Sequence, residues 1–179
     1  MPSWLWVVIG VAVAAGVTAA VVAGISAWNR AVRNYFLRLM SRREEARNIR
    51  RAFEGLVTQV RSIEEQKTAF ADDAEAVERR SLAELRDRSH QLAQELNTVA
   101  LPKRLWSVAE ALADACDILG EEAGRVGDEV TGDAALEALD AIDLARVGSA
   151  FAYSDLRFAE TSEDVGVEDS ETFAGGLYH

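Results

Sequence analysis

Charged residues are missing from one long stretch near the start of this 179-residue chain. No Asp, Glu, Lys or Arg occurs between Leu5 and Ala27, where the only polar side chains are those of Thr18 and Ser26. A helix in a globular core rarely runs so far without a polar face. About 20 apolar residues, rising 1.5 Å each, suffice to cross the hydrocarbon core of a bilayer. The missing charge therefore argues against a buried core helix and predicts a transmembrane span.

The residues around this stretch predict its orientation. Trp4, Trp6 and Trp28 lie at its ends, where indole rings are typical of the membrane–water interface. No Lys or Arg precedes the stretch, whereas eight arginines follow it between residues 29 and 51. We predict that residues 1–28 form a single-pass anchor in the cell inner membrane. Positive residues near a span stay in the cytoplasm, and here they follow the apolar stretch. The N-terminus would lie outside and the body in the cytoplasm.

A cleaved secretion signal is the alternative for this segment. Such a signal has its positive charge before a shorter apolar stretch, the reverse of the order found here. The small residues "GISA" before Trp28 resemble a cleavage site, so an exported helical protein stays open as an alternative. Small residues also recur at every fourth position of the span, which would allow two spans to pack closely and form a homo-oligomer. They are Ala12, Gly16, Ala20 and Gly24.

Residues typical of catalytic and metal sites are scarce. The chain has one cysteine, Cys116, and two histidines, His90 and His179, so it can form no internal disulfide and offers no convincing set of metal ligands. The glycine-rich motifs GxGxxG and GxxxxGK[ST] are absent. Adjacent acidic pairs such as Glu121 and Glu122 are expected on solvated helix faces. We therefore predict no catalytic residue, cofactor or metal site, and we expect Cys116 to be a small core residue.

Charge is sorted along the chain, whose formal net charge is −11. Residues 29–51 hold eight arginines and two glutamates, whereas residues 105–179 hold three basic and eighteen acidic residues. We predict that residues 29–51 form a basic juxtamembrane helix that binds the anionic inner leaflet. The arginines assigned to the lipid surface are Arg30, Arg33, Arg38, Arg42 and Arg43. The acidic remainder argues against nucleic-acid binding, which requires a basic footprint.

Proline and glycine are absent from a long part of the body. There are only two prolines in the chain, and neither residue type occurs between Leu56 and Leu101. Apolar positions recur there in steps of three and four, typical of a coiled coil or bundle helix. They include Phe53, Leu56, Val60, Ile63, Phe70, Val77, Leu82, Leu85, Leu92 and Leu96. We predict a long cytoplasmic helix with an imperfect seam. The alternative is a break between Phe70 and Ser81, where Asp72–Glu75 and Ser81–Glu84 have capping-box spacing.

Two shorter helices are predicted after this long one. Pro102 favours a new helix, whose apolar face runs from Leu105 to Leu119 and which ends in the glycines at 120, 124 and 127. A last helix is expected over about residues 134–160. Both would pack back on the long helix, so that residues 52–160 form an all-α helical bundle. Residues 161–179 are predicted to be a flexible acidic tail with three apolar docking residues, Phe173, Leu177 and Tyr178.

These features predict a non-catalytic, single-pass, membrane-anchored scaffold or adaptor. It would dock an unidentified cytoplasmic protein through its distal bundle and acidic tail. A structural stalk subunit of a membrane complex is the alternative, since the order of a span followed by a long cytoplasmic helix resembles the b subunit of rotary ATP synthases. That resemblance concerns layout and rests on no shared motif.

Overall fold

A computed structural model describes residues 3–127 and 130–167, apart from the side chains of residues 3–15 and of Val17. Every regular element in this part of the chain is a helix, so the predicted all-α fold is confirmed. The long helices are α1 (Ser3–Ser62), α3 (Val77–Thr98), α4 (Trp106–Ala123) and α6 (Leu144–Val165). Three short helices connect them: α2 (Glu64–Asp72), the 3₁₀ turn η1 (Lys103–Leu105) and α5 (Asp133–Asp140).

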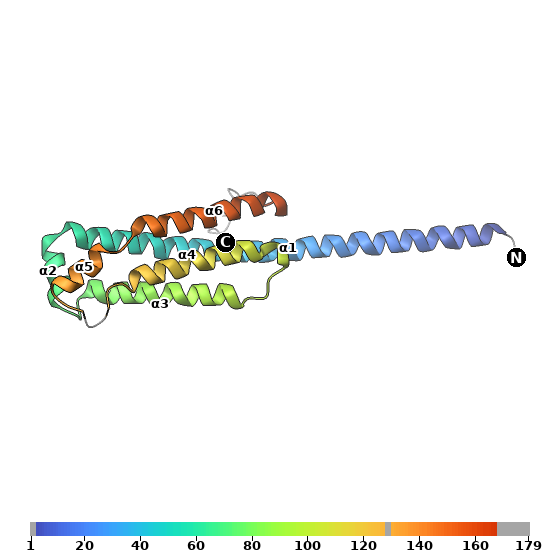
Figure 1. Cartoon of the computed structure of the whole chain (residues 1–179). Coiled ribbons are helices and arrows are strands. Elements are labelled where there is room, and N and C mark those ends of the chain that lie inside the picture. Colours follow the sequence, from blue (N-terminus) through green and yellow to red (C-terminus); the bar gives the residue numbers. More distant parts are fainter. Residues whose placement is uncertain (1–2, 128–129, 168–179) are drawn as a thin grey trace, which may run out of the picture.

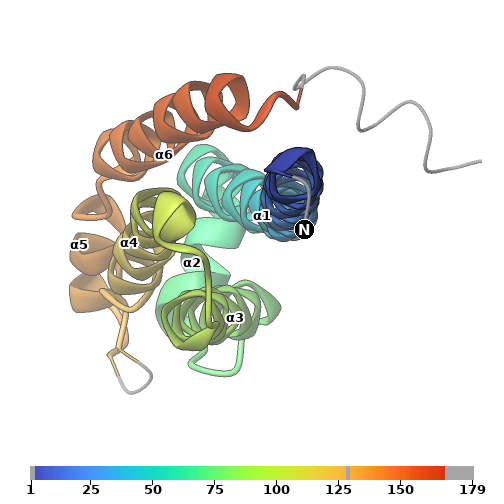
Figure 2. The ribbon, with the colours of Figure 1, turned by 90° about the vertical axis from the view of Figure 1, so that its right-hand side faces the viewer.

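The four long helices run alternately up and down and form one bundle with a continuous core (Figure 1). The second half of α1 packs against α3 and α6, and α4 packs against α3 and α6 (Figure 2). The connectors α2 and α5 meet at one end, which we call the distal end. The other end, from which α1 projects, is the proximal end. The short connections between antiparallel neighbours are typical of such bundles.

The first half of α1 extends beyond the bundle (Figure 1). From Thr18 to Arg30 every described side chain is exposed, including apolar Val22 and Ile25 at 57% and 56%. The first buried residue of α1 is Val32. Within the described residues, no helical stretch combines the length and the apolarity needed to cross a membrane.

A heptad seam does exist, but it begins earlier in the chain than predicted. Apart from Met40 and Ile49, the buried positions of α1 follow each other in steps of three and four, with half-buried Arg50 completing the series. They are Val32, Phe36, Leu39, Arg43, Ala46, Phe53, Val57 and Val60. Six of the predicted seam members are buried, whereas Ile63 and Val77 are 42% and 67% exposed. The buried ones are Phe53, Val60, Phe70, Leu82, Leu92 and Leu96. The bundle therefore begins near residue 32, within the segment assigned to the membrane surface, and not at residue 52.

The expected break between Phe70 and Ser81 is confirmed, because α2 ends at Asp72 and α3 begins at Val77, but the long helix also breaks earlier. Helix α1 ends at Ser62, where the next residue, Ile63, has an extended backbone. The series of α1 core positions stops at Val60. The next two heptad positions are the charged residues Glu64 and Lys67, so a straight continuation of the helix would have no apolar side chain there to bury. The chain instead reverses through α2, so that α3 returns antiparallel to α1. Neither capping-box candidate begins a helix: Asp72 ends α2, and Ser81 lies inside α3.

The helix after Pro102 is confirmed, whereas the last predicted helix is two. All seven apolar positions assigned to α4 and its start are buried: Leu105, Val108, Ala109, Leu112, Ala115, Cys116 and Leu119. The chain breaks between α5 and α6, where the Asp143 carboxylate caps α6 by accepting from the Arg146 N–H at 2.9 Å. Three long helices therefore pack on α1, not two.

Helix α6 runs past the predicted start of the tail. Gly166 ends it in the left-handed region, at φ 68°, and the Val167 N–H donates to the Ser162 carbonyl at 3.1 Å. Val167 is buried, as expected for the apolar residue that follows such a glycine cap. Helix α6 and its cap thus reach residue 167. The docking candidates Phe173, Leu177 and Tyr178 lie outside the described residues.

Candidate functional site

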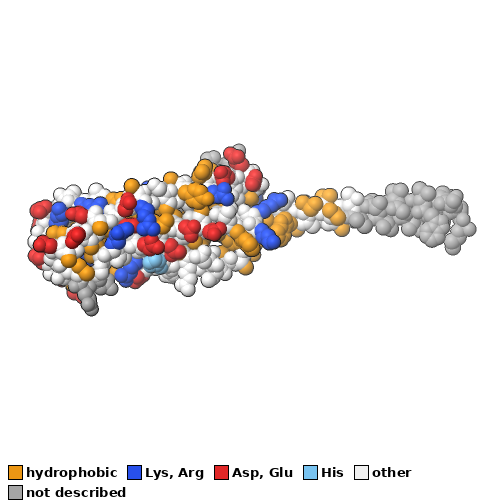
Figure 3. Space-filling model, in the orientation of Figure 1, with side chains coloured by type: hydrophobic (Ala, Val, Ile, Leu, Met, Phe, Trp, Pro, Cys, Tyr) orange, Lys and Arg blue, Asp and Glu red, His pale blue; other side chains and the backbone are white. Residues whose placement is uncertain are grey.

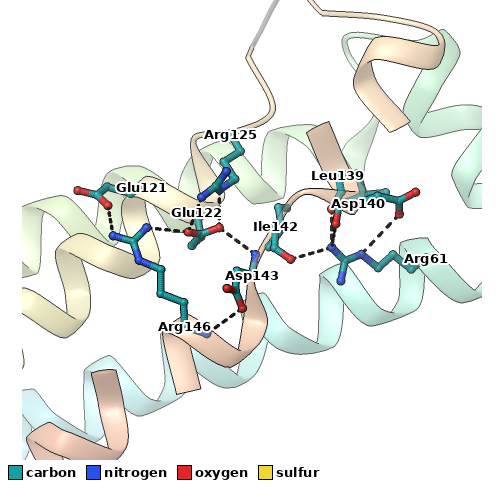
Figure 4. Close-up of polar contacts among 9 residues, drawn as sticks. All are labelled: Arg61, Glu121, Glu122, Arg125, Leu139, Asp140, Ile142, Asp143 and Arg146. Atoms are coloured by element: carbon teal, nitrogen blue, oxygen red, sulfur yellow. Dashed lines mark hydrogen bonds and ion pairs between the residues drawn. The ribbon is translucent and has the colours of Figure 1, made fainter. Parts of the chain in front are cut away.

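The most concentrated polar chemistry in the described chain surrounds Glu122, near the end of α4. Its side chain is fully buried, although the adjacent-acid pattern predicted a solvated position. Arg125 donates two hydrogen bonds to the carboxylate, Arg146 donates one at 2.8 Å, and the Asp143 N–H donates one at 2.9 Å (Figure 4). Both oxygens therefore accept two bonds each. Glu122 follows Leu112, Ala115 and Leu119 on the apolar stripe of α4, and this spacing was the signal that it faces inward.

The same junction is held from the other side by Arg61. Its Nη2 donates to the carbonyl oxygens of Leu139, Asp140 and Ile142 at 2.6, 3.1 and 2.9 Å (Figure 4). The last carbonyls of α5 have no partner within their helix, so the guanidinium takes the place of a C-terminal cap. Arg61 thereby ties the end of α1 to the break between α5 and α6.

These contacts make Glu122 a structural carboxylate. Burial raises its pKa, but the hydrogen bonds from Arg125, Asp143 and Arg146 outweigh burial and lower the pKa to about 2. A carboxylate that is ionised at neutral pH and accepts four hydrogen bonds has no lone pair positioned to take a proton from a substrate. The cluster therefore locks the distal end of the bundle and does not resemble a general base.

A second polar row joins α1 to α6. Arg43 is 4% exposed, its guanidinium lies 4.8 Å from the ring centroid of Phe158, and it donates to Asp155 at 2.8 Å. One heptad further along α1, Arg50 lies 5.4 Å from the ring centroid of Phe151. The two arginines and the two phenylalanines are each seven residues apart and pair in antiparallel order. Cation–π contacts of this kind stabilise a helix pair most where water is excluded.

The five arginines predicted at the lipid surface fall into two groups. Arg42 and Arg43 belong to the bundle, since Arg42 pairs with Glu45 and Glu95 at 2.8 Å and Arg43 with Asp155. Arg30, Arg33 and Arg38 are exposed. Arg30 donates to the Ser26 carbonyl within α1, and Arg38 lies over the ring of Tyr35. Arg42 is exposed as well, so its ion pairs and not its burial distinguish it from the second group.

The other predicted positions on α1 lie on its projecting half. Gly16, Ala20 and Gly24 are exposed, and a Cβ added at either glycine would meet no atom within 4 Å. Trp28 is 57% exposed, just before the bundle begins. The side chains of Trp4, Trp6 and Ala12 lie outside the described part. The described residues thus leave the row of small residues without a neighbour from the bundle.

Cys116 is a core residue, as predicted. It is 1% exposed, and the Ser89 hydroxyl donates to its backbone carbonyl at 2.6 Å, which joins α3 to α4. Burial, together with the nearby charges of Asp117 and Glu45, raises the pKa of the thiol to about 12. The thiol is therefore protonated at neutral pH and does not have the thiolate character of a reactive cysteine.

Open cavities lie between neighbouring helices of the bundle. Among the described residues, no group of three or more His, Cys, Asp or Glu side chains is arranged to hold a metal ion. One cavity of about 200 Å³ lies at the proximal end, between α1 and the end of α3. Its lining includes Tyr35, Leu39, Leu96, Val99 and Leu101.

Comparison with known proteins finds no relative. No family model matches the sequence, no curated protein is similar to it, and no solved structure matches the fold.

Proposed function

We propose that this protein is a non-catalytic, single-pass scaffold. In this proposal the start of α1 is anchored in the inner membrane and the helical bundle stands in the cytoplasm. The N-terminus would lie outside the cell, because the arginines follow the apolar segment and do not precede it. The bundle would present a docking surface to a cytoplasmic protein.

The observation that carries the proposal is the row of exposed apolar side chains on α1 between Val21 and Trp28. Val21, Val22, Ile25 and Trp28 are between 54% and 57% exposed, and no part of the bundle packs on them. Apolar surface of this extent requires a cover, which is either a bilayer or another protein. The uncharged sequence from Leu5 to Ala27 favours the bilayer, since water-facing or protein-facing helices of that length carry polar residues on at least one side.

The continuity of α1 supports a scaffold role. A single helix of 60 residues contains both the proposed anchor and one wall of the bundle, with no glycine or proline hinge at residues 29–51. The orientation of the bundle would therefore follow that of the anchor. The stalk alternative is less well supported, because α3, α4 and α6 fold back along α1 and none continues outward as an extended arm.

The anchor is tested with two matched glycine substitutions on α1. Gly16 lies in the middle of the apolar segment and Gly55 in the bundle half, and a Cβ at either would meet open space. An arginine at the centre of a span costs about 2.5–3.5 kcal/mol of insertion free energy. We expect Gly16→Arg to shift the chain from the carbonate-resistant membrane fraction to the soluble fraction, and Gly55→Arg to leave it in the membrane. Release of the unmodified chain by alkaline carbonate would contradict the anchor.

Topology and docking are tested separately. A reporter that works only in the cytoplasm should be active when it is fused after His179. A reporter that works only after export should be inactive at the same position. Truncation after Val167 removes the acidic tail and leaves the α6 cap intact, whereas a cut at residue 161 would remove the buried Ser162 and Val167. Crosslinking in cells, followed by mass spectrometry, should identify a partner of the full chain that the truncated chain loses. Equal recovery by both chains would remove the tail from the docking surface.

A further inference from the structure

The connection between α3 and α4 lies at the proximal end, beside the point where α1 leaves the bundle (Figure 1). Val99 and Leu101 of this connection share a cavity with Tyr35 and Arg38 of α1. Along α1, Tyr35 is seven residues after Trp28, which corresponds to about 10 Å of helix. The headgroup layer on each side of a bilayer is about 5–8 Å deep. If Trp28 marks the edge of the hydrocarbon core, Tyr35 lies a few ångströms beyond the headgroup layer, a gap that the long side chains of Lys103 and Arg104 can cross.

The composition of the connection is unusual for a surface loop. Val99 and Trp106 are 46% and 55% exposed, and both basic residues of η1, Lys103 and Arg104, are also exposed. No acidic residue occurs between Leu96 and Ala109, although Glu95, which pairs with Arg42, and Glu110 flank the connection. The Trp106 indole N–H donates to the Leu101 carbonyl at 2.8 Å, so its one polar group is already satisfied. On the face drawn in Figure 3, hydrophobic and basic side chains gather where α1 leaves the bundle.

We propose that residues 99–106 form a second membrane contact, which rests on the anionic headgroups of the inner leaflet. This inference depends on the anchor proposed above. Exposed tryptophan and valine beside two positive charges match an interface that is apolar on one side and negatively charged on the other. The contact would fix the bundle against the membrane at two points, the end of the span and this loop.

Acidic residues lie on the other side of the proximal end, so only the loop side would contact the membrane. The last turns of α6 carry Glu160, Glu163 and Asp164, all exposed. Figure 2 shows α6 and α3 on different sides of the bundle, so these acids are separated from the loop that follows α3. Anionic lipid attracts the loop and repels the end of α6. The bundle would therefore tilt so that its loop side faces the membrane.

Spin labels on the full chain test this contact. Single cysteines are placed at Ala100 in the loop, Glu163 on α6 and Ala74 at the distal end, all exposed positions. The native Cys116 is buried and does not compete for the label. The chain is reconstituted in phosphatidylcholine vesicles with or without phosphatidylglycerol, and the accessibility of each label to oxygen and to a water-soluble nickel complex is measured.

We expect the label at residue 100 to move from the aqueous to the interfacial range when phosphatidylglycerol is present, while those at 163 and 74 stay aqueous. The double variant Lys103→Glu/Arg104→Glu should return label 100 to the aqueous range. The control Lys67→Glu should have no effect, because Lys67, the only other lysine of the chain, lies in α2 at the distal end. If label 100 is as aqueous as label 74 in these vesicles while the chain resists carbonate extraction, the loop contact is wrong and the anchor stands. Extraction of the chain would instead overturn the anchor.

Discussion

The two ends of the bundle differ in how the ends of their helices are capped. At the distal end, the exposed ends of helices are closed by the chain itself: Arg61 caps α5, and Glu122 binds Arg125, Arg146 and the backbone of Asp143. At the proximal end, α1 continues out of the bundle, and Val99 and Trp106 are left about half exposed. Both ends expose apolar side chains, Ile63 and Val77 at the distal end and Val99 and Trp106 at the proximal end. The two ends therefore differ in the polar contacts that cap the distal helices and in the helix that continues from the proximal end.

The largest effect is expected from the core of the proximal end. Phe158 is fully buried, its ring centroid lies 5.9 Å from that of Phe36, and it also contacts Arg43. Phe158→Ala should lower the free energy of unfolding by about 3–5 kcal/mol, because it leaves a cavity and removes both ring contacts. Urea denaturation followed by circular dichroism measures the change. Leu156→Ala, on the exposed face of α6, should change it by less than about 0.5 kcal/mol; equal losses would show that the proximal core is not packed as described.

A smaller loss is expected at the distal end from Glu122→Gln. The substitution keeps the shape of the side chain but replaces charged acceptors with a neutral amide, at a cost of about 2–3 kcal/mol. The same denaturation experiment measures it. The control Glu121→Gln changes the neighbouring, mostly exposed carboxylate and should cost less than about 0.5 kcal/mol. If the two variants behave alike, the polar network does not hold the distal end together.

The same network predicts how stability changes with acid. The pKa of Glu122 is lowered from 4.5 to about 2 in the folded chain, so the unfolded chain binds its proton more readily. The stabilisation is therefore fully present above pH 4.5 and is lost as the pH falls from 4.5 towards 2. Thermal melts across this range should show a steeper loss for the unmodified chain than for Glu122→Gln. Parallel pH curves would contradict the assignment.

The smallest expected effect is a gain in the free energy of unfolding, and it should differ between the two halves of α1. Gly55 is exposed in the bundle half, and an added Cβ would meet nothing within 4 Å. Gly55→Ala should raise the free energy of unfolding by about 0.5–1 kcal/mol, because alanine restricts the unfolded chain and favours helix. Gly24→Ala lies in the half that does not touch the bundle and should leave bundle unfolding unchanged. A similar gain at both sites would mean that the halves unfold as one unit.

Several features were predictable because they follow from spacing within one helix. The stripe from Leu105 to Leu119 placed α4 correctly and identified Cys116 as a core residue. The same stripe reaches Glu122, but treating adjacent acids as solvated hid the buried carboxylate. The end of α1 at Ser62 was missed because no glycine or proline marks it. The signal available was the loss of apolar residues after Val60.

The sequence by itself determined the helical class of the chain, the uncharged stretch before residue 28 and the apolar faces of individual helices, because composition and periodicity act within a few turns. Tertiary structure alone decided where α1 stops, which arginines enter the bundle and which carboxylate is buried. Arg43 and Arg30 are the same residue type on the same helix, yet one contacts Phe158 and Asp155 from α6 and the other faces outward. That difference depends on partners more than 100 residues away, which no local pattern specifies.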